Sequence, residues 1–214
     1  MTAMVACVML LPFLFVGLLP AMERGEVTIA VQPEEYELYD RIIEDKFLTS
    51  QIQLVLLERM TVSRLVPNQP ESMTPAFVQQ QGFFDGVLPE DLVRDFVGAN
   101  QVRTRLEGRF QFGVRYRFVS DQTTDDREAS VAVLVRQYMR IPTQAPMVLD
   151  RLALSRVGRT VRNDQALVYV ENVRPDGTGA GLLVWLHREA RQWVIFDTEV
   201  VWTIRSRAGD SEGP

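Results

Sequence analysis

The sequence predicts an α+β protein, in which an N-terminal transmembrane helix precedes an antiparallel sheet packed with helices. Three observations lead to this prediction. An uncharged apolar run of 20 residues, Ala3–Met22, stands near the start of the chain. Helical apolar periodicity dominates the middle of the chain, and short β-type runs joined by tight turns fill the C-terminal third. Helices followed by strands are typical of layered α+β domains.

The apolar run Ala3–Met22 is long enough to span a bilayer as a helix. A cleaved signal peptide is the alternative, but no Lys or Arg precedes the run, and a cut after Ala21 would place Leu19 where a small residue is required. The pattern therefore favours a retained signal-anchor, with the domain on the periplasmic side of a bacterial inner membrane. The expected organisation is a membrane segment at 1–24, a linker at 25–33, an extramembrane α+β domain at 34–205 and a flexible tail at 206–214.

Composition narrows the chemistry of the domain. The chain has one Cys, at position 7, and one His, so an internal disulfide and a Cys/His zinc site are not expected. The formal net charge is −5, which argues against a nucleic-acid partner because such domains are net basic. Of the 23 basic residues only Lys46 is a lysine. This bias is typical of a GC-rich genome, and contact of Arg with phosphate or lipid headgroups is the alternative reading.

Three segments of the first half are expected to be helical. Pro33 opens the first, with acidic residues in its first turn and an apolar stripe at spacings of three and four. The stripe consists of Tyr36, Tyr39, Ile42, Ile43 and Phe47. A buried strand is expected over 52–62, a loop over 67–75, and two further helices over 77–82 and 89–99.

Strands are expected from residue 105 onward. Residues 105–119 alternate strictly, so we expect the aromatic and apolar side chains to face the core and the arginines between them to face solvent. The core set is Phe110, Phe112, Val114, Tyr116 and Phe118. A turn is expected over 121–127 and an apolar run over 131–135. Three β-type runs, 165–171, 181–187 and 192–204, predict a meander of antiparallel hairpins.

The C-terminal third carries a recognisable order of residues. Leu154-Ser155-Arg156-Val157-Gly158 is followed by the run 165–170, a glycine-rich turn at 177–181, and Trp193 and Trp202. This order resembles an uncharacterised group of bacterial exported or envelope proteins, although Arg159 stands where Phe is usual. The resemblance implies a curved antiparallel sheet similar to cystatin-like or NTF2-like cones, and it implies no activity.

Two arginine clusters are the candidate partner-binding surfaces. One cluster lies along the strand expected at 105–119, and the other spans 151–162. The simpler interpretation is a solvated face that pairs with the acidic helix near 34–45. The alternative is docking on an acidic protein surface or anionic lipid. The residues assigned to partner contact are Arg109, Arg115, Arg117, Arg156 and Arg159.

Other candidate sites have simpler explanations. His187 has no acid and nucleophile at the spacing of a catalytic triad, so it is expected at a surface or hairpin end. The run 176–181 lacks the G-K-[ST] ending of a phosphate loop and is expected to be a hairpin turn. The tryptophans are expected in the core rather than on a stacking platform. No catalytic residue, cofactor or metal site is assigned.

The sequence therefore favours a non-catalytic, single-pass accessory subunit of a larger bacterial membrane complex, for example a respiratory or photosynthetic one. Its expected partners are other subunits, contacted through the N-terminal helix and the arginine-rich faces, and membrane lipid. The alternative is an envelope domain that binds a small apolar ligand, or an enzyme with an internal cone-shaped pocket.

Overall fold

A mixed β-sheet forms the centre of the fold. A computed structural model describes residues 31–119, 147–174 and 177–205. Its helices are α1 (Pro33–Lys46), α2 (Pro75–Gln81) and α3 (Glu90–Ala99), with short 3-10 turns at η1 (Pro70–Ser72) and η2 (Phe83–Gly86). Its strands are β1 (Ile52–Glu58), β2 (Arg115–Val119), β3 (Met147–Leu154), β4 (Gly158–Arg159), β5 (Gln165–Val173), β6 (Gly179–Glu189) and β7 (Gln192–Ile204).

The sheet has the strand order β2-β1-β3-β5-β6-β7, and β4 pairs with β5. The expected C-terminal meander is confirmed, because β3, β5, β6 and β7 pair antiparallel. The expectation of a wholly antiparallel sheet is wrong, because β1 is parallel to both β2 and β3. Hairpin signals report only on strands that are neighbours in sequence. The pairing of β1 joins segments far apart in the chain, so no turn residue in the sequence indicates this pairing.

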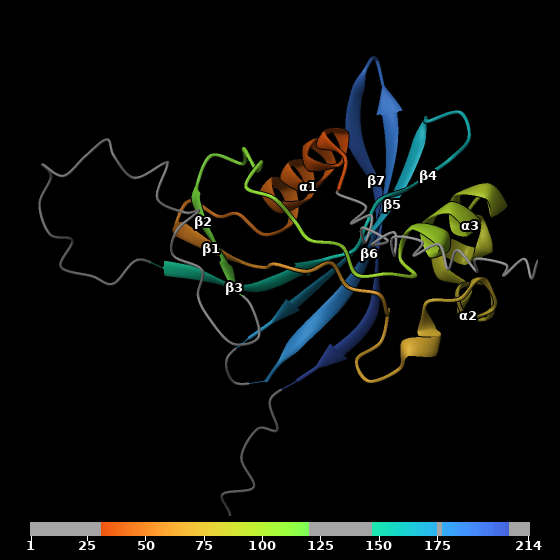
Figure 1. The fold of residues 1–214 in the computed structure, drawn as a ribbon, viewed down its shortest axis with the longest axis horizontal. Helices are drawn as coiled ribbons and strands as arrows, with labels where there is room; N and C mark the ends of the chain where they lie inside the picture. The colour runs from red at the N-terminus through yellow and green to blue at the C-terminus, as the bar shows by residue number, and fades with distance from the viewer. Residues whose placement is uncertain (1–30, 120–146, 175–176, 206–214) are drawn as a thin grey trace, which may run out of the picture.

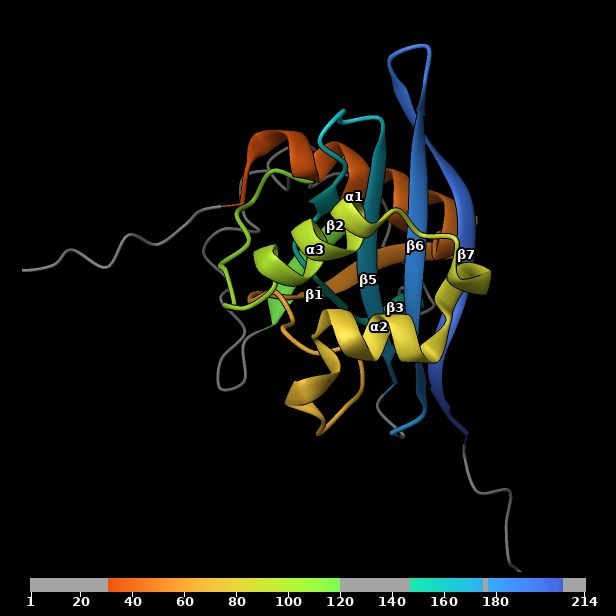
Figure 2. The same cartoon turned by 90° about the vertical axis from the view of Figure 1, so that its right-hand side faces the viewer.

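The helices cover opposite faces of this sheet (Figures 1 and 2). Helix α1 packs on one face, in a core cluster that includes Val168 and Val184. Helices α2 and α3 pack on the other face, in a cluster that includes Leu167 and Leu183. Alternate residues of β5 and β6 thus supply the two cores, which explains why these central strands are apolar on both sides.

Helix α1 forms where the sequence predicts it. Pro33 occupies its first turn, where the missing N–H costs no hydrogen bond, and the Glu35 carboxylate accepts a hydrogen bond from the Gln32 backbone N–H. The expected stripe is confirmed: Tyr36, Tyr39, Ile42 and Ile43 are buried, and Phe47 packs against them half-buried.

The segment 105–119 confirms the expected core residues but not the expected length of the strand. Phe110, Phe112 and Phe118 are buried, Val114 and Tyr116 pack half-buried against them, and the alternate arginines are exposed. Only the last five residues, β2, form a strand. Before them, Arg105 makes only an isolated bridge with Met60, and the Glu107 backbone N–H donates to the Tyr36 hydroxyl of α1 at 2.7 Å, so this stretch does not continue as a strand.

The expectation of a transmembrane helix is corrected by the structure. None of the helices in ranges 31–119, 147–174 and 177–205 combines the length and apolar character needed to cross a bilayer. The signal-anchor, the inner-membrane localisation and the periplasmic placement therefore have no support in the described part of the chain. The segment Ala3–Met22 on which they rested lies outside the described residues, as do 121–127 and 131–135.

Candidate functional site

A surface groove follows the boundary between α1 and β7. Its larger part has a volume of about 720 Å³ and is lined by α1 from Pro33 to Glu44, by Arg109 and Gln111, and by the start of β7 at 192–194. Its smaller part, of about 370 Å³, is lined by Arg41, Asp45 and Lys46 of α1 and by 194–198 of β7. Arg41 and Val194 line both parts, so the two hollows adjoin each other beside β7, and together they are called the groove.

Strand β7 is the last strand of the sheet. Its 13 residues pair on one side with β6, and no other described strand pairs with it. Three large apolar side chains on it are strongly exposed, namely Phe196 at 58%, Val200 at 53% and Ile204 at 50%. They make up half of the six most exposed large hydrophobic residues in the described chain. A long edge of this kind offers unpaired backbone groups to another polypeptide.

The groove is lined by more acidic than basic side chains. Three of the acids, Glu37, Asp40 and Glu44, follow one another on α1 at spacings of three and four and share one side of the helix. Two of the bases already have acidic neighbours: Arg109 Nε lies 2.6 Å from Glu107 Oε2, and Lys46 Nζ lies 3.2 Å from Asp45 Oδ2.

Asp40 is the most perturbed carboxyl group in the groove. Its Oδ2 accepts a hydrogen bond from the Gln111 backbone N–H at 3.0 Å, while its Oδ1 is buried and has no hydrogen-bond partner in the described residues. Burial raises the pKa of Asp40 to about 6, the negative charge of Glu44 adds to this rise, and the Gln111 hydrogen bond opposes it. A positive charge placed beside Asp40 would favour its ionised form.

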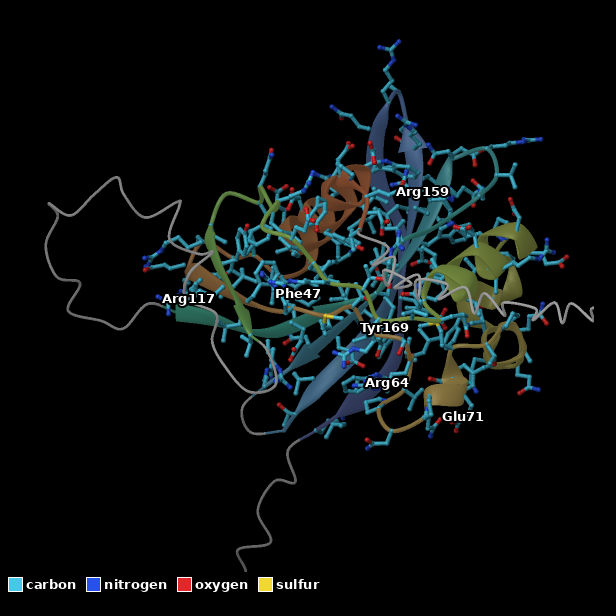
Figure 3. All side chains as sticks on the ribbon, viewed as in Figure 1. Phe47, Arg64, Glu71, Arg117, Arg159 and Tyr169 are labelled. Atoms are coloured by element: carbon cyan, nitrogen blue, oxygen red, sulfur yellow. The ribbon has the colours of Figure 1, made fainter. Side chains whose placement is uncertain are left out.

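The five arginines assigned to partner contact lie in three different places. Arg109 lines the groove, and Arg159 lies near it, with its guanidinium 5.6 Å from the ring centre of Trp193. Arg115 and Arg117 are exposed on β2, the opposite edge of the sheet. Figure 3 shows Arg117 and Arg159 on different sides of the molecule. The arginines therefore do not form one surface.

Arg156 is buried instead of facing a partner. Its side chain is 11% exposed, and its Nη2 lies 2.5 Å from Oε1 of Glu35, which is itself buried on α1. The same carboxylate accepts hydrogen bonds from the Tyr39 hydroxyl at 3.1 Å and from the Val157 backbone N–H at 3.0 Å. The acidic helix was expected to pair with the arginines on the surface. Its Glu35 does pair with Arg156, but in the interior of the protein.

The segment 154–158, which carries the resemblance, joins the layers of the fold. The Arg156 backbone N–H donates to Asn100 Oδ1 at 2.7 Å, and Asn100 Nδ2 donates to the Arg156 carbonyl at 3.0 Å. Ser155 and Tyr169 bond through the backbone of both residues and the Ser155 hydroxyl. A Cβ at Gly158 would overlap the backbone and Cβ of Phe96 on α3. Each of these residues has a structural role, and none of them lines the groove.

The remaining sequence candidates also have structural roles. A hairpin does connect β5 to β6, and Gly177 has a φ of 79°, but the turn is shorter than the expected 176–181, because 179–181 already belong to β6 and pair with β5; residue 176 lies outside the described residues. His187 stacks on Phe196 with ring centres 4.1 Å apart, and burial lowers the pKa of its imidazole. Trp185 and Trp193 are buried as expected, and Trp202 is half-buried.

A second buried polar network lies beneath Trp202. The indole Nε1–H of Trp202 donates to the Tyr169 hydroxyl at 2.7 Å, and that hydroxyl donates to Glu171 Oε1 at 3.1 Å. Arg64 Nη2 lies 3.5 Å from the other oxygen of Glu171. Burial raises the pKa of both Tyr169 and Glu171. These contacts join β5 to β7 and to the segment after β1, so the network has a structural role, although Arg64 Nε is buried with no hydrogen-bond partner among the described residues.

Sequence reasoning missed the groove itself. Asp40 and the edge of β7 were not singled out, although two signals point to them. Among the three runs of the expected meander, the run 192–204 has a neighbouring run on one side only, which favours an edge. The acids at 37, 40 and 44 recur at spacings of three and four, so three acids share one side of the helix with Arg41 as the cation among them.

Within the described residues, no group of three or more His, Cys, Asp and Glu side chains is arranged to hold a metal ion. Comparison of the chain with protein-family models, curated proteins and solved structures gave no significant match.

Proposed function

We propose that this chain is a non-catalytic docking domain, an accessory subunit that binds a polypeptide partner in the groove between α1 and β7. The groove beside the outer edge of β7, an edge with which no other described strand pairs, is the observation that carries the proposal. A helix beside an edge strand suits capture of an extended peptide, because the strand offers backbone hydrogen bonds and the helix flank offers side-chain contacts.

The alternative of a small apolar ligand receives less support. Pockets for such ligands are concave and mostly apolar. The larger part of the groove is open, and Glu37, Asp40, Arg41, Glu44 and Arg109 are among the 11 residues that line it. Both faces of the sheet meanwhile pack into filled hydrophobic clusters. A charged open groove favours a polypeptide over an apolar small molecule.

Site-specific photo-crosslinking in the cells that produce the protein tests this proposal. A benzophenone amino acid replaces Glu37 or Thr198, which line the two parts of the groove. The matched control places it at Val161, which is 89% exposed and does not line the groove. We expect a discrete protein adduct from the groove positions and none from the control. Equal adducts at all three positions, or none in the groove, would contradict the proposal.

A further inference from the structure

The two edges of the sheet differ in how they meet another chain. On β2, Arg115 and Arg117 are two of five residues and both are exposed. Basic side chains on an edge strand discourage further pairing. On β7, the 13 residues 192–204 include no Lys, Arg, Pro or Gly, and they are rich in Val, Ile, Thr and aromatic residues. The edge of β7 is therefore the one suited to accept a strand.

The charge of the groove selects the partner. Five carboxylates and three cationic side chains line its two parts, which leaves a net charge of −2. The acids are Glu37, Asp40, Glu44, Asp45 and Asp197, and the bases are Arg41, Lys46 and Arg109. Glu107 lies beside Arg109 and reduces its effect further. A basic segment is complementary to this lining, whereas an acidic one would be repelled.

We propose that the groove takes an extended basic segment of the partner, which adds as a further strand to the outer edge of β7, left open by the strands in the described ranges, and places a Lys or Arg side chain between Asp40 and Glu44. This inference rests on the docking function proposed above and names the chemistry of the partner. A second copy of this chain fits less well, because pairing of β7 with β7 would bring Asp197 and Glu199 of each copy to one interface.

Titration of Asp40 should make binding of the basic segment pH-dependent. The charged groups that line this part of the groove with Asp40 are Glu37, Arg41 and Glu44 on α1 and Arg109 opposite, while β7 contributes only uncharged side chains there. Since the pKa of Asp40 is about 6, its carboxyl group is ionised at about pH 7.5 and protonated at about pH 5. Binding of a basic segment should therefore weaken as the pH falls from about 7.5 to about 5.

The probe is a short fluorescein-labelled peptide in which Arg alternates with Val and Thr, and fluorescence anisotropy reports its binding to the full chain. Its first control has Glu in place of Arg. Two further versions carry N-methyl groups on alternate residues, one version for each edge of the peptide, because N-methylation removes the hydrogen-bond donors that strand addition needs.

We expect the Arg peptide to bind at least about tenfold more tightly than the Glu peptide at low salt. One of the N-methylated versions should lose about tenfold or more in affinity, and the other should bind nearly as well as the parent peptide. The double substitution Asp40→Asn with Glu44→Gln should lower the affinity about tenfold and remove the pH dependence. The control Glu71→Gln with Glu90→Gln removes the same charge outside the groove lining and should change neither.

Several outcomes would overturn the inference. Absence of binding, equal binding of the Arg and Glu peptides, or full binding of both N-methylated peptides would each do so. An equal loss in the groove and control variants would show non-specific attraction, and a concentration-dependent dimer that excludes the peptide would make a second copy the occupant. If crosslinks still form in the groove while the basic peptide fails, the docking function stands and this inference falls.

Discussion

Replacing Glu35 with Ala should destabilise the protein severely, because a buried guanidinium would lose its partner. The carboxylate bonds to the Arg156 side chain, the Val157 backbone N–H and the Tyr39 hydroxyl, at distances between 2.5 and 3.4 Å. Removing one member of a buried ion pair costs about 3–5 kcal/mol. The free energy of unfolding of a domain is only about 5–15 kcal/mol, so this change would remove a large share of it.

Urea unfolding followed by tryptophan fluorescence measures the effect, since Trp185 and Trp193 are buried. With a denaturant slope of about 2 kcal/mol/M, a loss of about 3–5 kcal/mol lowers the midpoint by about 1.5–2.5 M. The matched control is Glu37→Ala, which lies two residues away on the exposed side of α1 and should change stability by about 0.5 kcal/mol or less.

A double-mutant cycle with Arg156→Met then separates the ion pair from the rest of the network. The backbone of Arg156 keeps its hydrogen bonds to Asn100 in this variant, so only the side-chain contact changes. The double variant should lose less stability than the sum of the two single variants, by about 1–3 kcal/mol. Strict additivity, or a loss below about 1 kcal/mol for Glu35→Ala, would refute the assignment of Arg156 to a buried structural pair.

Three further predictions concern the core and the groove. Gly158→Ala should lower the thermal midpoint clearly in differential scanning fluorimetry, because its Cβ meets the backbone of Phe96, and an unchanged midpoint would contradict this packing. Phe112→Ala should cost about 3–5 kcal/mol in urea unfolding, and a loss below about 1 kcal/mol would mean that its site is peripheral. Asp40→Asn should raise stability at about pH 7.5 but not at about pH 4, because the elevated pKa of Asp40 means that folding is opposed by ionisation and stability falls as pH rises through 4–6. Solvent around this half-exposed group keeps the gain to about 1 kcal/mol, and a gain that persists at about pH 4 would reject this cause.

Local patterns predicted the parts of the fold that local physics determines. The apolar spacing of α1, the hairpin between β5 and β6 and the alternation of aromatic residues up to the end of β2 all depend on residues close together in sequence. The parallel pairing of β1 depends on segments that meet only in the folded protein, so neither turn residues nor periodicity indicated it. The sheet was for this reason expected to be antiparallel throughout.

Arg156 shows the same limit at the level of a single site residue. Arginine is rarely buried unless it is paired, so an arginine-rich stretch is normally assigned to the surface. Its partner Glu35 stands 121 residues earlier, and both residues sit in charged surroundings in the sequence. The groove was missed for a related reason, because it forms only when the first helix lies beside the last strand.

The parallel pairing of β1 also determines when this protein can fold during synthesis. Strand β1 emerges from the ribosome early, but its neighbour β3 follows only after the three helices and β2. Helix α1 completes its packing later still, because it contacts β7, which follows all the other described strands in the chain. Contacts between such distant segments slow folding and leave apolar surface uncovered in the meantime. The growing chain therefore carries α1 and β1 without their full packing partners until β7 has been translated, and this interval is when a chaperone would engage it.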